Sequence, residues 1–213
     1  MTQTETASRL SILDEPTITL TRLAAIIAGS DESDVRDAFA ASVNQVPVEW
    51  IEELVIQSYL FSGFPRALNA AREWRRVAPQ PAPLTDEGDD VTHVDEWRQH
   101  GEATCAAVYG SMYEKLRVNV RQLHPALDAA MVVEGYGKIL SRPGLDLQRR
   151  ELCIVAACAI TRQDRQLHSH LHGALNVGVS PDVLASAIDA LLPLLGPERT
   201  RSVRLLLARV VGK

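Results

Sequence analysis

The sequence is poor in several residue types, and each shortage argues against a class of protein. Phe, Trp and Tyr make up only 5% of the chain, while Ala, Leu and Val are abundant. Aliphatic side chains of this kind favour packed helices over a β-sandwich or barrel. The three cysteines, Cys105, Cys153 and Cys158, are too few and odd in number for a disulfide framework, which indicates a reducing compartment. We therefore expect an all-α protein.

The chain also lacks a basic field and a long apolar run. With 22 Lys and Arg against 27 Asp and Glu, its net charge is −5, which does not attract nucleic acid or an anionic membrane. No uncharged apolar stretch approaches the ~18 residues that a membrane-spanning helix needs. The first residues lack a basic region followed by an apolar one, so we expect no signal peptide. These absences predict a cytoplasmic protein without nucleic-acid or membrane partners.

What is present is a succession of helical patterns, interrupted by one unlike segment. Residues 1–16 are polar and are predicted to form a mobile tail. Residues 79–96 contain three prolines and six acids but no Lys or Arg, so we expect a solvated linker with no regular structure beyond an isolated turn. Without those six acids, 22 basic and 21 acidic residues remain, so the acidity marks no binding face. Helical patterns fill residues 17–78 and 97–213.

The two helical regions contain an internal repeat. Residues 46–63, VPVEWIEELVIQSYLFSG, match residues 179–196, VSPDVLASAIDALLPLLG, when the final glycines are superposed. The cap, the apolar stripe and the terminal glycine agree together. We therefore predict a helical bundle of two half-repeats that pack about a pseudo-twofold axis. The first copy is degenerate, because no histidine precedes His93.

Titratable side chains cluster in the second copy. His170 lies at the edge of the apolar stripe of its helix, where a histidine can face a cleft and exchange protons near neutral pH, or bond a backbone carbonyl. Glu151 opens the preceding helix and could act with His170 as an acid or base, although it could also complement the helix dipole or pair with a neighbouring arginine. Cys158 shares the face of Glu151 two turns on, whereas Cys153 does not, and both fit as small core side chains.

A second pattern on the same helix is Asp164, His168 and His172. Two histidines at positions i and i+4 can bind one metal ion. No closing carboxylate or cysteine is evident in the sequence, and a solvated polar edge explains the pattern equally well. We therefore predict no metal and no other cofactor.

Three segments together resemble the carboxymuconolactone decarboxylase family. They are YGKILSRPGLDLQRREL at 136–152, QLHSHLHGALNVGVSPDVL at 166–184, and YLFSGFP at 59–65. The resemblance covers most of residues 17–78 and 97–212. It implies an all-helical fold and assembly into trimers or hexamers. It also implies either lactone decarboxylation or the peroxidase chemistry of the related alkyl hydroperoxide reductase D-like, peroxiredoxin-like proteins.

The resemblance assigns roles residue by residue. The family histidine falls on His170, and the glutamate of hydroperoxidase-type members, nineteen positions earlier, falls on Glu151. The two cysteines of those members fall on Gln163 and Gln166, so the peroxidatic dithiol is absent. Lactone decarboxylases commonly carry serine where Glu151 stands. The sequence thus combines the two patterns.

From these observations we expect a carboxy-lyase-like enzyme that acts on a small carboxylated lactone or related acid. Glu151 and His170 are the predicted acid–base pair, within reach of each other across adjacent helices, and Gln163 and Gln166 the predicted substrate-binding amides. The alternatives are a peroxidase-like redox protein, weakened by the missing dithiol, and a non-catalytic module that binds a small acid. Apolar surface left over from internal packing predicts a homo-oligomer, a trimer or else a dimer.

Overall fold

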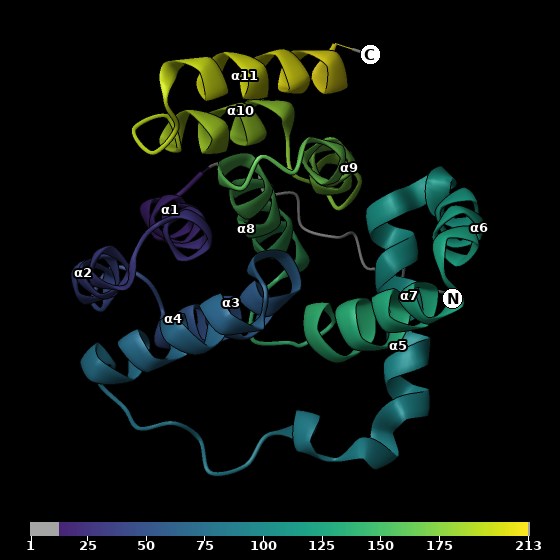
Figure 1. Cartoon of the computed structure of the whole chain (residues 1–213), viewed down its shortest axis with the longest axis horizontal. Coiled ribbons are helices and arrows are strands. Elements are labelled where there is room, and N and C mark those ends of the chain that lie inside the picture. Colours follow the sequence, from purple (N-terminus) through teal and green to yellow (C-terminus); the bar gives the residue numbers. More distant parts are fainter. Residues whose placement is uncertain (1–12, 213) are drawn as a thin grey trace, which may run out of the picture.

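The computed structural model describes residues 13–212, and this part of the chain is built of helices without a β-strand (Figure 1). The prediction of an all-α fold is confirmed. The α-helices are α1 (Glu15–Gly29), α2 (Glu32–Ser42), α3 (Val48–Ser62), α4 (Phe64–Val77), α5 (Val94–Tyr109), α6 (Tyr113–Leu123), α7 (Pro125–Ala130), α8 (Leu147–Ile160), α9 (Asp164–Asn176), α10 (Pro181–Ala190) and α11 (Pro197–Val211). Short 3₁₀ turns are η1 (Glu87–Asp89), η2 (Val91–His93) and η3 (Gly110–Met112), and η4 (Met131–Leu140) is a π-helix.

Local sequence signals explain where several helices begin. Asp146 caps α8 by accepting the backbone N–H of Arg149 at 2.9 Å, and Ser180 caps α10 by accepting that of Val183 at 3.3 Å. Asp and Ser are among the residues preferred at this position, because a side-chain oxygen there satisfies a free N–H of the first turn. Asp14 caps α1 in the same way, so the helix starts inside the segment predicted as a tail. The rest of that predicted tail, residues 1–12, lies outside the described residues.

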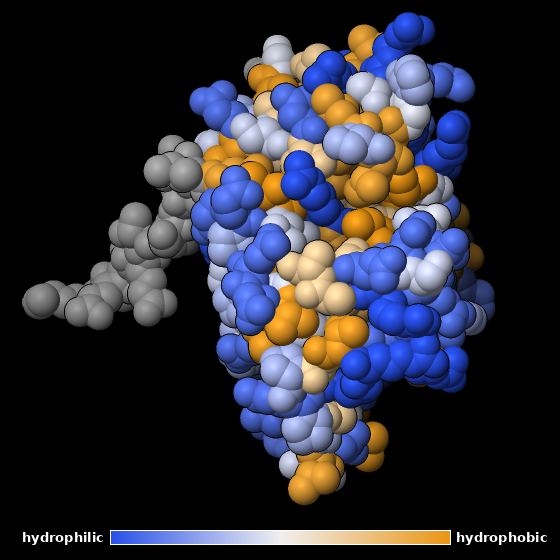
Figure 2. All heavy atoms as spheres, turned by 90° about the vertical axis from the view of Figure 1, so that its left-hand side faces the viewer, coloured by the Kyte–Doolittle hydropathy of each residue, from blue (hydrophilic) through white to orange (hydrophobic). Residues whose placement is uncertain are grey.

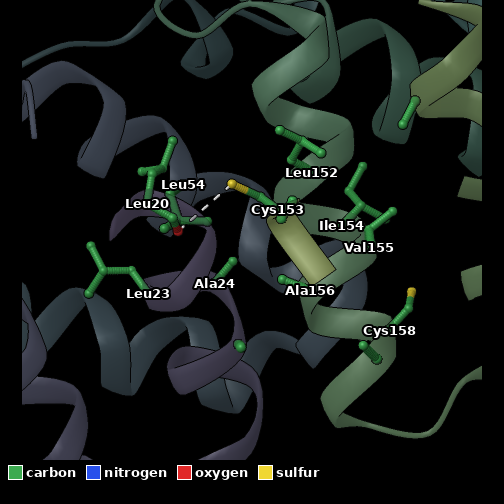
Figure 3. Close-up of a cluster of buried hydrophobic side chains, with 14 of the residues drawn as sticks. Leu20, Leu23, Ala24, Leu54, Leu152, Cys153, Ile154, Val155, Ala156 and Cys158 are labelled. Carbon is green, nitrogen blue, oxygen red and sulfur yellow. Dashed lines mark hydrogen bonds between the residues drawn. The ribbon is translucent and has the colours of Figure 1, made fainter. Parts of the chain in front are cut away.

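Helix α8 runs through the centre of the molecule. Ten consecutive residues, 150–159, are buried, so the helix is enclosed on all sides rather than on one stripe. It packs against α1, α3, α9 and α10. Figure 3 shows Cys153 directed towards α1, where its sulfur lies 4.0 Å from the carbonyl oxygen of Leu20, while Cys158 points to a different side. A polar residue on α8 is therefore held inside the core.

The helix bounds repeat along the chain. Helices α1 and α2 begin 132 positions before α8 and α9, and α3 and α4 begin 133 positions before α10 and α11. The first helix of each set packs against the other, since α1 lies along α8. This regular spacing agrees with two copies of a four-helix unit. The pseudo-twofold relation between the copies stays a prediction.

The middle of the chain adds α5 and η4, which cross at very short distance. A Cβ atom at Gly101 would overlap the carbonyl oxygen of Val132, and one at Gly137 would overlap that of Trp97. Only glycine permits this approach. The wider coil of η4 places the Tyr136 side chain in the core, and π-helical turns of this kind often occur at functional sites.

The acidic linker is better ordered than we predicted. Residues 79–96 include both η1 and η2, and α5 begins at Val94, before the predicted end of the linker. Asp86, expected to be unpaired, forms two hydrogen bonds of 2.8 Å with the Arg142 guanidinium. The expectation failed here because the partner of Asp86 is distant in sequence. The segment is therefore fastened to the helical body at this point.

The Asp86–Arg142 pair should be visible in pH-dependent stability. Hydrogen bonds from Arg142 lower the pKa of Asp86 below its ordinary value. The pair therefore stabilises the fold above pH ~4 and loses this contribution as the pH falls through the lowered pKa. We expect Asp86→Asn to reduce the free energy of unfolding in urea by about 1 kcal/mol at pH 7 and by much less at pH 3. Asp89→Asn, which alters an exposed linker acid, is the control, and equal losses from both variants would contradict this role.

The surface leaves some apolar side chains uncovered. Phe64 and Leu68 on α4 are 60% and 56% exposed, and Leu123 at the end of α6 is 77% exposed. Figure 2 views the side that carries α2 and α4 and shows groups of hydrophobic residues separated by hydrophilic ones. Within residues 13–212, every helix is too short or too polar to cross a lipid bilayer.

Candidate active site

Glu151 and His170 meet because α8 and α9 form a helical hairpin. Residues 161–163 join the two helices, and Arg162 makes the turn in the left-handed region with φ of 60°. The chain then runs back along α8, so a residue near the start of α8 faces one in the middle of α9. Glu151 and His170, nineteen positions apart in the sequence, are thereby brought into direct contact.

The contact is a buried hydrogen bond. His170 Nδ1 lies 2.8 Å from Glu151 Oε2, and the side chains are 3% and 0% exposed. The prediction that these two residues approach each other across adjacent helices is confirmed. Which partner carries the proton depends on the tautomer and protonation state of the pair. In either state one proton can be held between a carboxylate and an imidazole that are both buried.

The second carboxylate oxygen of the pair has no partner. Glu151 Oε1 is buried and forms no hydrogen bond within the described residues. A buried acceptor left unpaired costs about 1–3 kcal/mol, so this oxygen needs an explanation. An oxygen kept free inside a core can accept a proton from, or donate one to, a bound molecule.

Gly173 provides the space for the carboxylate. A Cβ atom at this position of α9 would lie 2.6 Å from Glu151 Oε2 and 2.7 Å from Cγ1 of Val108. Both distances are shorter than any real contact of a Cβ atom. The glycine is thus required by the side chain of Glu151 rather than by its own backbone.

Gly173→Ala should therefore displace Glu151 and destabilise the fold. We expect a loss of about 1–3 kcal/mol, the usual cost of overpacking a core, in urea unfolding. The matched control is Gly196→Ala, because a Cβ atom there meets nothing within 4 Å. If both variants lose the same stability, Gly173 has no special relation to the pair.

Aromatic rings enclose the histidine. Phe61 of α3 meets the His170 ring edge-on with centroids 5.4 Å apart, and Tyr109 of α5 meets it at 6.3 Å. Tyr136 of η4 lies behind Tyr109 at 6.0 Å. Burial raises the pKa of both tyrosines, and the charge of Glu151 raises them further, so both hydroxyls stay protonated. The first copy, residues 17–78, thus supplies the ring of Phe61 to the site.

The two tyrosines were absent from the sequence-based site. The sequence did contain a signal for Tyr109 and Tyr136. Each directly precedes a glycine, Gly110 or Gly137, and the chain has only four tyrosines. Their contact with the pair depends on the crossing of α5 and η4, which the sequence pattern does not display.

The cysteines are poor nucleophiles. Cys105, Cys153 and Cys158 are all free and buried, and burial raises the pKa of each thiol to about 12. The charge of Glu151 adds to this effect at Cys105 and Cys158. Thiol chemistry requires the thiolate, which is scarce at neutral pH under these conditions.

The predicted amides lie away from the pair. Gln163 and Gln166 are exposed at the start of α9, one to two turns before His170. A substrate-binding role for them requires a ligand that extends from the buried pair to this end of the helix.

The three residues of the possible metal-binding pattern on α9, Asp164, His168 and His172, make other contacts. Asp164 pairs with Arg199 at 2.5 Å, and the rings of His168 and His172 stack edge-on at 4.8 Å. Within residues 13–212, no three His, Cys, Asp or Glu side chains are arranged to hold a metal ion.

Arg150, next to Glu151 on α8, fixes this helix to α3. Its guanidinium is fully buried and donates to Glu53 at 2.7 Å and to Gln57 at 3.0 Å. Arg142 also donates to Glu53, with both distances 2.9 Å. Burial lowers the pKa of Arg150, and Glu53 opposes this effect. The network fixes α8 to α3 at the residue directly before Glu151.

Comparison with known proteins shows which family the region around the site is similar to. Residues 125–208 match the model of the carboxymuconolactone decarboxylase family, and this region includes both Glu151 and His170. The chain is also 29% identical over 141 residues to Peroxisomal protein 2 of the fission yeast Schizosaccharomyces pombe. That match covers 64% of this chain and 64% of the yeast protein, so it spans less than two thirds of the relative.

Proposed function

We propose that this chain, which carries a carboxymuconolactone decarboxylase family domain at residues 125–208, is a carboxy-lyase-like enzyme that acts on a small carboxylated lactone or a related acid. The observation that supports this most directly is the buried Glu151–His170 contact of 2.8 Å with its unpaired carboxylate oxygen. Such a pair can hold a proton out of contact with water and release it to a substrate.

In the proposed reaction, the bond between the ring carbon and the carboxylate breaks and CO₂ leaves. The electron pair of that bond passes into the conjugated lactone carbonyl to give a dienolate. The protonated Glu151–His170 pair then donates its proton to the carbon that lost CO₂. Water returns a proton to the pair, so one proton is consumed for each CO₂ released.

The enclosure of the pair suits this chemistry. Phe61 and Tyr109 shield His170, and both rings are themselves partly exposed, so either could turn aside for a substrate. A site without water strengthens the interaction between the pair and the charge that develops on the substrate.

A substrate panel tests the proposal. The purified protein is incubated with carboxylated lactones and, separately, with alkyl hydroperoxides and a dithiol reductant. We expect CO₂ release from a carboxylated lactone and no peroxide consumption, because the dithiol is missing and the thiols are buried. Peroxide reduction would favour the redox alternative, and inactivity towards both classes would favour a non-catalytic small-acid-binding module.

We also propose that the chain assembles into a small closed homo-oligomer. The exposed apolar side chains of α4, α6 and α7 support this, since uncovered patches of this kind are commonly buried between subunits. We expect light scattering at micromolar concentration to give the mass of a trimer, or of a dimer as second choice. A strictly monomeric mass would show that the two halves of the chain cover each other without a partner.

We also propose that the protein is located in the cytoplasm. The yeast relative is named as a peroxisomal protein, so the two locations should be compared directly. Cell fractionation of the native host would separate them.

A further inference from the structure

A cavity lies beside the candidate site, on the side of α9 that carries His168 and His172. It is a cleft of about 500 Å³ between α9 and the segment formed by η3 and α6. Its polar lining includes Lys115 and Asn119 of α6 and His168 and His172 of α9. Met112 and Leu116 give it an apolar part. The volume suits a small organic molecule.

The charge of the cleft is unusual for this chain. Among the described residues that line it, none is acidic, although the chain has 27 acids against 22 Lys and Arg. A comparable cavity beside the linker, of about 550 Å³, is lined by five acids, among them Glu49, Glu53 and Asp86, against Lys138 and Arg142. The lining of the cleft on α9 therefore favours an organic anion more than the lining of this acidic cavity does.

The cleft and the buried pair share a wall. Val108 and Tyr109 line the cleft. The Tyr109 ring meets His170, and Val108 lies beside the space at Gly173 that the Glu151 carboxylate occupies. On α9, residues two positions apart point in nearly opposite directions, so His168 and His172 face the cleft while His170 faces Glu151. A molecule in the cleft is separated from the pair by Tyr109, which is half-buried.

We propose that this cleft binds the carboxylate of a small organic acid, with Lys115 as its charged anchor and Tyr109 as the movable ring between the ligand and Glu151–His170. Lys115 and the two histidines can donate to the carboxylate, and Met112 and Leu116 contact the apolar part of the ligand. The proposal that the cleft binds an anion is argued from the lining of the cleft alone. The proposal that the cleft is the substrate site rests on the proposed function.

Binding of a simple probe tests the cleft separately from catalysis. The probe is the γ-lactone acid 5-oxotetrahydrofuran-2-carboxylate, titrated calorimetrically into the full chain, with its uncharged amide as the matched ligand. We expect saturable binding of the acid, binding at least tenfold weaker for the amide, and about tenfold weaker binding of the acid by Lys115→Gln. Lys115 is exposed, so its substitution should leave the melting temperature unchanged.

Two control variants locate the site. Lys138→Gln alters a lysine in the acidic cavity and should bind the acid within twofold of the original protein. Arg72→Gln, which alters an exposed arginine of α4, should do the same. The proposal is overturned if the original chain shows no saturable binding, if Lys115→Gln binds normally, or if Lys138→Gln is the variant that binds weakly.

Failure of the proposed anion site and failure of the proposed catalytic function would give different results. Binding that depends on Lys115, without turnover of any carboxylated lactone, would reject the proposed function and leave the anion site intact. Turnover that requires Glu151 but shows the same KM in Lys115→Gln would reject the cleft and leave the catalytic pair intact.

Discussion

Glu151→Gln and His170→Asn should each lower the kcat for a carboxylated lactone by about 10² to 10⁴, the usual contribution of a positioned acid or base. Glutamine keeps the size of the glutamate and its hydrogen-bonding capacity but cannot carry the proton. Asparagine is shorter than histidine and removes the imidazole that contacts Glu151 at 2.8 Å. Because the two residues act as one unit, the double variant should be little worse than either single variant.

The control is His100→Asn, which alters an exposed histidine of α5 far along the chain from the pair. It should retain the original kcat. Circular dichroism and urea unfolding of each variant separate a loss of chemistry from a loss of fold. Full activity in a folded Glu151→Gln protein would remove this residue from the mechanism.

Arg150→Met should destabilise the fold by about 3 kcal/mol or more, the largest stability effect that we expect. The substitution leaves Glu53 buried near an apolar side chain, and an uncompensated buried charge typically costs 3–5 kcal/mol. Arg142 still pairs with Glu53, which holds the loss towards the lower end of this range. The free energy of unfolding in urea gives the value.

Two further variants show whether charge is the cause. The double variant Arg150→Met with Glu53→Gln should recover part of the loss, because it removes a buried charge that has lost one of its two arginine partners. Arg72→Met alters an exposed arginine of α4 and should change stability by less than about 0.5 kcal/mol. A loss below 1 kcal/mol for Arg150→Met would mean that the buried network contributes little to the position of α8.

Much of this architecture could be predicted from local sequence signals. The caps Asp146 and Ser180 mark helix starts by their own side-chain bonds to the backbone. The contact of Glu151 with His170 followed from the spacing of two helices joined by a short turn. These features depend on neighbours in sequence, which is why they were accessible.

Some helix boundaries were not predicted, for identifiable reasons. Helix α4 lies inside the region 17–78 that was predicted to be helical, but its own bounds, Phe64–Val77, were not predicted. Helix α10 ends at Ala190 rather than continuing towards Gly196, because Pro193 cannot continue a helix. Gly110, with φ of 52°, separates α5 from α6. Glycine and proline effects of this kind are visible in the sequence once the boundary is sought.

The remaining features depend on distant parts of the chain. Asp86 and Arg142 are 56 residues apart, and Glu53 and Arg150 are 97 apart. The rings of Phe61 and Tyr109 reach His170 only through the packing of α3 and α5 against the second half of the chain. No local pattern encodes these pairs. The exposure of Gln163 and Gln166 likewise depends on how the whole of α9 is seated.

The most direct test of a buried proton-donating pair is the fate of the proton itself. The reaction of a carboxylated lactone is run in D₂O, and the product is examined by NMR at the carbon that lost CO₂. We predict one deuterium per product molecule, on a single face, from the original chain, and residual product with deuterium on both faces from Glu151→Gln and His170→Asn. Deuterium on both faces from the original chain, or an unchanged rate and face in the two variants, would contradict the assignment of Glu151 and His170.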